Sequence, residues 1–337
     1  MNKSQVLSKS DWASYFLAAI SLFLVLKMGL LVALFSGLVL YSLVRLLVPT
    51  IQKRVSNRYA RLIAVGLLSS LVIISLSLAI WGLVAFFRSD AGNLQNLMQK
   101  LADMVEASRQ QLPLWISSAI PEDVDGLKRI LIDTLREHAG EAKVVGQEAG
   151  HIIVHILLGM IIASMVALQD VVAPHKSRPF AMALSQRLQS LADIFHRVVF
   201  AQVRISLINT IFTAIFLAVI LPMAGVHLPL VKSMIAVTFI AGLIPVVGNI
   251  ISNTVIVIVS LSHSLQMAVV SLSFMIVIHK LEYFLNARII GSQVNAKAWE
   301  LLTAILVMET LFGLPGVVAA PVFYSYLKKE LSDRQLV

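Results

Sequence analysis

Two short segments that contain Pro and Gly interrupt the longest apolar stretches of the chain. The first is Ile244-Pro245-Val-Val-Gly248-Asn249, with Asn253 one helical turn later, and the second is Phe312-Gly313-Leu-Pro-Gly316, followed by Pro321. Non-helical backbone at membrane depth is tolerated only where it is buried in protein or lines a wet cavity. A pair of interruptions indicates a binding site for a polar solute or an ion, because broken helices offer unpaired amide and carbonyl groups. An ordinary turn between two short spans is the alternative interpretation.

Carboxylate and amide side chains accompany both interruptions. Glu309 precedes the second interruption and has mostly apolar neighbours, so its carboxylate could bind a proton or a cation. Glu282 and Asn286 end the preceding apolar stretch, where Glu282 could instead pair with a nearby Lys or Arg. The predicted solute or ion pathway therefore consists of Pro245, Gly248, Asn249, Asn253, Glu282, Asn286, Glu309, Gly313, Gly316 and Pro321.

Residues suited to catalysis or metal binding are few. His151 and His155 are four positions apart, a spacing at which two imidazoles could share a metal ion. No HExxH pattern and no third ligand accompany them, so we interpret them as residues at the membrane end of a helix. The sequence also has no nucleophile elbow and no phosphate-binding loop. We therefore predict neither an enzyme nor a cofactor or metal site.

The composition indicates that lipid surrounds most of the chain. Of 337 residues, 58% are hydrophobic and only 13% are charged, and the mean hydropathy is +0.87. Soluble domains carry about a quarter charged residues. The net charge of +9 fits basic cytoplasmic loops. Lys and Arg are not interleaved with aromatic residues as in single-strand nucleic-acid binders, so nucleic acid is not an expected partner.

The apolar stretches predict an all-α, polytopic transmembrane bundle. Stretches at 12–26, 28–48, 61–87, 149–168, 205–221 and 267–285 each suit one membrane crossing, and the first two should pack as a hairpin. Stretches 232–262 and 299–327 exceed the roughly 20 residues of one crossing, so we expect each to form two half-length helices. One such hairpin would then enter from each membrane face, although two single crossings remain an alternative.

Charge divides the chain into regions and orients them. Residues 1–87 should hold the first three transmembrane helices, and the polar region 88–148 should form a small external helical domain. Residues 149–337 should form the transport core, with a cytoplasmic amphipathic helix over 173–203. The basic loop 50–61 places both termini in the cytoplasm of a multi-pass protein of the bacterial inner membrane.

Short motifs near the C-terminus occur in a characteristic order. They are Ile244-Pro-Val-Val-Gly248, Glu282-Tyr-Phe-Leu-Asn-Ala-Arg-Ile-Ile-Gly291 and Gly313-Leu-Pro-Gly-Val-Val-Ala-Ala-Pro321, with Ala201-Gln202 before them. In this order they resemble the autoinducer-2 exporter family, also called PerM-like permeases, and the likeness covers nearly the whole chain. Ala287 stands where the family usually has Pro, and residues 294–299 lack its usual His-Pro. The cargo therefore need not be that of other members.

The resemblance implies a function and an assembly. It implies a permease that moves a small polar solute such as autoinducer-2 out of the cell, with or without ion coupling, and that assembles as a homo-oligomer, a pentamer in known members. A Na⁺/H⁺ antiporter is the nearest alternative. A non-transporting scaffold that docks partners through residues 88–148 is another. An intramembrane enzyme is the least supported, since it would need His151 and His155 to bind a metal.

Overall fold

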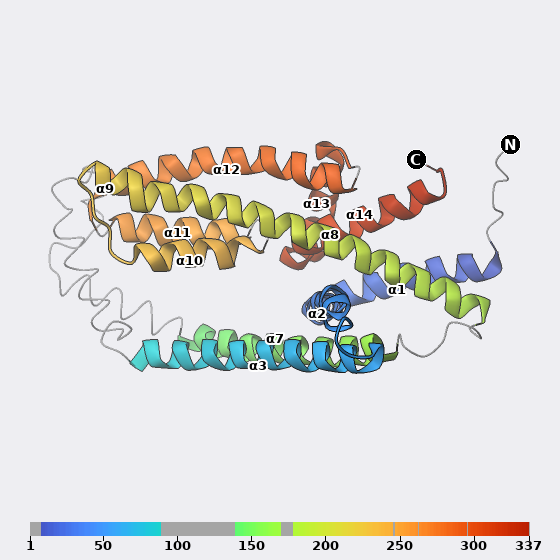
Figure 1. The fold of residues 1–337 in the computed structure, drawn as a ribbon. Coiled ribbons are helices and arrows are strands. Elements are labelled where there is room, and N and C mark those ends of the chain that lie inside the picture. The colour runs from blue at the N-terminus through green and yellow to red at the C-terminus, as the bar shows by residue number, and fades with distance from the viewer. Residues whose placement is uncertain are drawn as a thin grey trace.

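The computed structural model describes residues 8–88, 139–169, 178–244, 247–261, 263–294 and 296–336. Within these ranges the chain is helical and contains no strand (Figure 1). The helices are α1 (Lys9–Lys27), α2 (Leu31–Ile51), α3 (Asn57–Arg88), α7 (Ala139–Gln169), α8 (Pro179–Ile215), α9 (Leu221–Met223), α10 (Val231–Gly242), α11 (Val247–Leu261), α12 (Leu265–Val294), α13 (Ala298–Phe312) and α14 (Leu314–Asp333).

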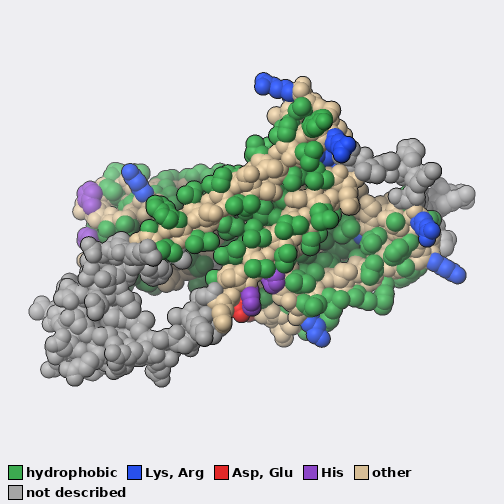
Figure 2. All heavy atoms as spheres, turned by 90° about the horizontal axis from the view of Figure 1, so that it is seen from below, with side chains coloured by type: hydrophobic (Ala, Val, Ile, Leu, Met, Phe, Trp, Pro, Cys, Tyr) green, Lys and Arg blue, Asp and Glu red, His purple; other side chains and the backbone are tan. Residues whose placement is uncertain are grey.

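Five helical stretches of the described chain are long and apolar enough to cross a membrane. They are Lys9–Lys27, Leu31–Ile51, Asn57–Gly82, Gln147–Gln169 and Pro179–Met223. Large hydrophobic side chains are exposed along them, and hydrophobic side chains dominate the face drawn in Figure 2. A surface of this kind suits contact with lipid rather than water. The predicted all-α, multi-pass membrane bundle is therefore confirmed.

Helix α8 is the central element of the fold. It continues through a π-helical turn, Phe216–Ile220, into α9, so the helix runs unbroken from Pro179 to Met223. The sequence predicted an amphipathic helix over 173–203 and a separate span over 205–221. The structure joins them, because no Gly or Pro separates the two parts. Helices α1, α2, α10, α12 and α14 all pack against this one helix.

The prediction that the first two spans pack against each other as a hairpin is wrong. The chain does break between α1 and α2, where Gly29 has φ +69°. However, α1 packs mainly on α8, whereas α2 packs mainly on α7 and α3, and the two helices scarcely touch. The cause is a small-residue contact. A Cβ on Gly159 of α7 would lie 2.0 Å from the Ala33 carbonyl oxygen of α2, so the two backbones approach more closely than larger side chains would permit.

Both long apolar stretches fold as hairpins, as predicted. Helices α10 and α11 have 12 and 15 residues. At 1.5 Å per residue they are about 18 and 23 Å long, less than the roughly 30 Å of a bilayer core. Helices α13 and α14 form the second hairpin; α13 has 15 residues, but α14 has 20 and is therefore not the half-length helix that was predicted. Because α12 is one helix of 30 residues between them, the two hairpins start from its opposite ends (Figure 1).

The predicted external domain lies mostly outside the described residues. Residues 89–138 belong to that part of the chain, so the domain over 88–148 stays a prediction. The described chain resumes at Ala139, where α7 begins.

Candidate functional site

A row of buried polar residues runs along α8. Gln202, Ser206, Asn209 and Thr213 follow one another at spacings of four, three and four, so they share one face of the helix, and all are buried. Hydrogen bonds from two of them show that this face meets α10. At the sequence level Gln202 appeared only in the Ala201-Gln202 motif, and the row as a whole was missed because the residues lie inside an otherwise apolar span. Their helical spacing was the available signal.

This row holds the C-terminal end of α10. The Gln202 Nε2 donates to the Gly242 carbonyl at 2.8 Å, and the Ser206 Oγ donates to the Phe239 carbonyl at 2.7 Å. The carbonyls of Ile240 and Ala241, which lie between these two, accept from the main-chain amides of Leu243 (3.3 Å) and Ile244 (2.9 Å), respectively. All four terminal carbonyls of α10 therefore have partners. The expectation that these groups would be unpaired is wrong, because α8 brings side-chain donors to them.

The turn between α10 and α11 is close-packed. A Cβ on Gly248 would lie 1.9 Å from the Ala241 carbonyl oxygen, so no larger residue fits without moving the backbone. A Cβ on Gly242 would similarly lie 2.7 Å from the Ser206 Oγ. These glycines keep the two arms of the hairpin, and α10 and α8, in close contact.

Asn249 and Asn253 lie beyond this turn, one helical turn apart on α11, and are half-buried. Pro245 lies outside the described residues. Glu282 and Asn286 belong to α12, but their side chains are also outside the described part of the structure. The structure therefore places only part of the predicted pathway at this hairpin.

The second hairpin carries the remaining predicted residues. Gly313, at the turn, has φ +62°, and its amide donates to the Glu309 carbonyl at 2.7 Å. A Cβ on Gly316 would lie 2.0 Å from the Met308 carbonyl oxygen, and Pro321 is buried within α14. The Glu309 side chain is exposed in the last turn of α13. Both breaks thus use glycine where two backbones meet.

The two hairpins contact α8 at consecutive sections. Helix α14 packs on the section from Leu191 to Val198 through Val322 and Tyr326, whereas α10 packs on the section that starts at Gln202. The two hairpins that carry the described predicted residues therefore contact neighbouring sections of α8 through α10 and α14.

Near the C-terminal end of α14 lies a buried ion pair that the sequence did not suggest. Arg187 of α8 pairs with Glu330 of α14, and both side chains are buried. Tyr15 of α1 donates to the same carboxylate at 3.1 Å, and its ring lies 4.1 Å from the Arg187 guanidinium carbon. The cluster joins three helices that are distant in sequence.

A second polar contact closes the base of the α13–α14 hairpin. Glu300, in the first turn of α13 and outside the five candidate spans, accepts from Lys328 and, at 2.8 Å, from the Tyr324 hydroxyl. The hydrogen bond from Lys328, then that from Tyr324, lowers the pKa of Glu300 to about 2. The carboxylate therefore stays ionised at neutral pH and ties the two arms together.

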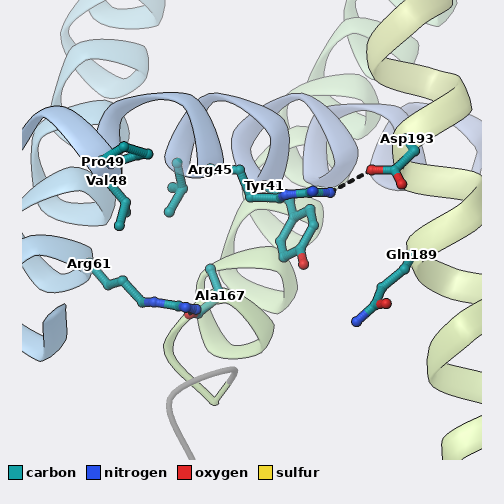
Figure 3. A pocket seen from close by; sticks show the side chains of 9 residues that line it. Tyr41, Arg45, Val48, Pro49, Arg61, Ala167, Gln189 and Asp193 are labelled. Atoms are coloured by element: carbon teal, nitrogen blue, oxygen red, sulfur yellow. Dashed lines mark hydrogen bonds and ion pairs between the residues drawn. The ribbon is translucent and has the colours of Figure 1, made fainter.

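An arginine-lined pocket lies where α2, α3 and α7 come together beside α8 (Figure 3). Its volume is about 320 Å³. Arg45 pairs with Asp193 at 2.6 Å, and Arg61 donates to the Ala167 carbonyl at 3.0 Å. At the sequence level Arg61 is simply one of the basic residues of the segment 50–61 that orients the chain. Nothing in the spacing of these residues indicated that they would meet, because they come from separate helices.

Comparison with known proteins agrees with this architecture. The model of the family described as "AI-2E family transporter" matches residues 14–333. The protein YdbI of Bacillus subtilis (strain 168), whose name gives it a provisional role in transport, is 31% identical over 135 residues. That match covers 39% of this chain and 37% of YdbI. No solved structure matches the chain. Since the family model spans nearly all of the described helices, the chain belongs to the AI-2E transporter family.

Proposed function

We propose that the protein exports a small polar solute of the autoinducer-2 kind across the bacterial inner membrane. Membership of a transporter family supports movement of a solute. The observation that carries the proposal is the pair of glycine-broken hairpins packed on consecutive sections of α8, the first against a row of buried polar side chains. Polar groups buried in a membrane span are costly unless they serve a partner or a wet pathway.

The contacts of Gln202 and Ser206 suggest how the pathway would open. In the described conformation both side chains occupy the carbonyls at the end of α10. A displacement of the α10–α11 hairpin would free these carbonyls together with the two donors. A polar solute could then replace each lost hydrogen bond, so the solute itself would stabilise the open state.

Exchange of a cation for H⁺ is the second candidate function. It is favoured by Glu309, a carboxylate that is exposed on α13 among exposed apolar side chains such as Leu306 and Leu311. A carboxylate at this position could bind a proton or Na⁺ alternately. The same group could also couple an ion gradient to solute export.

The two functions are separated by flux from proteoliposomes that contain autoinducer-2, with and without Na⁺ and H⁺ gradients. We expect solute efflux from wild type, and a loss of about tenfold or more in Gln202→Leu. A dependence on either gradient that disappears in Glu309→Gln would assign ion coupling. Asp333→Asn, which removes an exposed carboxylate near the C-terminus, is the matched control. Reconstituted protein that moves neither solute nor ions would favour the scaffold role.

The proposed arrangement in the cell follows from charge. The basic loop 50–61 supports a cytoplasmic location for both termini. Exposed apolar residues on α13, among them Trp299 and Leu302, offer surface for lipid or for another copy of the chain, which supports a homo-oligomer. Accessibility of single cysteines to a membrane-impermeant reagent tests the orientation, since the natural chain has no cysteine.

A further inference from the structure

The arginine-lined pocket lies at the ends of three candidate spans. Pro49 is in the last turn of α2, Arg61 is near the start of α3, and Ala167 is in the last turn of α7. All three line the pocket. The ends of membrane-spanning helices lie at the level of the lipid headgroups. A ligand of this pocket would therefore be expected at headgroup depth, outside the transport site proposed above.

The pocket has a net positive charge. Among the described residues, its lining carries the guanidinium groups of Arg45 and Arg61 and one carboxylate, Asp193. The Arg45 and Asp193 side chains are about half exposed, at 52% and 45%. Two guanidinium groups bring planar forks of N–H donors that match the oxygens of a phosphate. The amide of Gln189 adds a neutral polar group to the same wall (Figure 3).

An apolar cavity adjoins the arginines. It has a volume of about 480 Å³ and lies between α2, α7 and α8. Tyr41 and Gln189 line both this cavity and the arginine-lined pocket, so the two spaces are adjacent. The walls of the cavity are mainly aliphatic, with Leu34, Leu38, Leu158, Ile162, Val166 and Leu188. A soluble anion would leave these walls uncovered.

We propose that this joined space binds one phospholipid with an anionic headgroup. The phosphate lies against Arg45 and Arg61, and an acyl chain lies along the cavity between α2, α7 and α8. Basic pockets between transmembrane helices are known to hold acidic headgroups. Burial of the acyl chain adds a hydrophobic contribution that a free phosphate lacks. The lipid would fill the cavity between α2, α7 and α8, beside the ion pair of Arg45 and Asp193 that joins α2 to α8.

Native mass spectrometry of the purified full chain, with lipids added back, tests the proposal. The probes are phosphatidylglycerol, phosphatidylcholine and glycerol phosphate. We expect wild type to retain one phosphatidylglycerol in preference to phosphatidylcholine, and Arg61→Gln to weaken that binding about tenfold. Arg54→Gln is the matched control, because it removes the same charge from an exposed position in the turn just before α3. It should bind as wild type does.

Two further variants separate the headgroup from the acyl chain. Asp193→Asn removes the one carboxylate among the described residues of the pocket lining and should tighten phosphatidylglycerol binding several-fold. Ser185→Phe places a ring in the apolar cavity and should weaken binding although no charge changes. Circular dichroism and monodispersity confirm that each variant is folded. The proposal is overturned if Arg61→Gln and Arg54→Gln bind equally, or if glycerol phosphate displaces phosphatidylglycerol at equal concentration.

Discussion

Gln202 of α8 donates a 2.8 Å hydrogen bond to the carbonyl of Gly242, the last residue of α10. The donor lies near the middle of the helix that runs from Pro179 to Met223. The acceptor lies at the point where an apolar helix stops after only 12 residues. This contact explains how a broken helix is tolerated among apolar segments, since a buried carbonyl without a partner is costly. Most of the following predictions concern contacts of this kind.

Gln202→Leu should destabilise the fold. The substitution leaves the Gly242 carbonyl buried without its donor, at a cost of about 1–3 kcal/mol. Chemical unfolding in mild detergent, followed by circular dichroism, measures the change. Gln266→Leu, an exposed position at the start of α12, should have little effect. Equal losses in the two variants would contradict a specific role for the Gln202 contact.

Gly248→Ala should open the α10–α11 hairpin. The added Cβ would lie 1.9 Å from the Ala241 carbonyl oxygen, so the backbones must separate, at a cost of about 1–3 kcal/mol. The same unfolding measurement applies. Gly66→Ala is the control, because nothing lies within 4 Å of its Cβ and α3 should gain slightly from the alanine. A Gly248→Ala protein as stable as wild type would show that the hairpin is looser than described.

Gly159→Ala should separate α2 from α7. Its Cβ would lie 2.0 Å from the Ala33 carbonyl oxygen and 2.5 Å from the Ser36 Oγ. The strain should lower the midpoint of thermal unfolding and increase cleavage by protease within the loop between α2 and α3. Gly150 lies on the same helix, and a Cβ added there would have no atom within 4 Å, so Gly150→Ala is the control. That control should leave both readouts unchanged.

Glu330→Gln should be among the most destabilising substitutions. It leaves the Arg187 guanidinium buried without a counter-charge, which costs about 3–5 kcal/mol. Asp333→Asn is the matched change three residues later, where the carboxylate is exposed and pairs with Lys329 at 2.8 Å. Its effect should stay below about 1 kcal/mol. Thermal unfolding in detergent distinguishes the two, and similar melting temperatures would contradict the structural role of the Arg187–Glu330 pair.

Acid should weaken the base of the α13–α14 hairpin. Because Lys328 and Tyr324 lower the pKa of Glu300 from 4.5 to about 2, the stabilisation is complete above pH 4.5 and is lost as the pH falls through 2. The stability of wild type should therefore decline over this window more than that of Glu300→Gln. Urea titrations between pH 6 and 2 measure the difference. Parallel pH profiles would exclude Glu300 as the titrating group.

Hydrophobic patterning made the helices of this fold predictable, and chain breakers made the hairpins predictable. Apolar runs marked the spans, and the glycines at 248 and 316 marked places where backbones meet. Register and packing partners were not predictable. Nothing in the runs at 12–26 and 28–48 shows that Gly159 draws α2 toward α7 and away from α1. That choice depends on shape complementarity between distant segments, which hydropathy does not encode.

The candidate site was predicted in part for a related reason. The interruptions were visible as sequence anomalies. Gln202 was visible only as part of a short motif and Ser206 not at all, and their role as donors appears only when α10 lies beside them. Arg187 and Glu330 likewise gain meaning only as a pair, since 142 intervening positions hide their contact. Glu309 could be identified from the sequence because a carboxylate is rare within an apolar stretch. Residues whose role depends on a partner distant in the sequence could not be identified in this way.

The unbroken α12 has a mechanical consequence. A straight helix of 30 residues with a hairpin attached at each end acts as a lever. If the lever tilts about its centre, one end rises while the other descends. Since each hairpin joins α12 at one end, the bases of the two hairpins would then move in opposite directions.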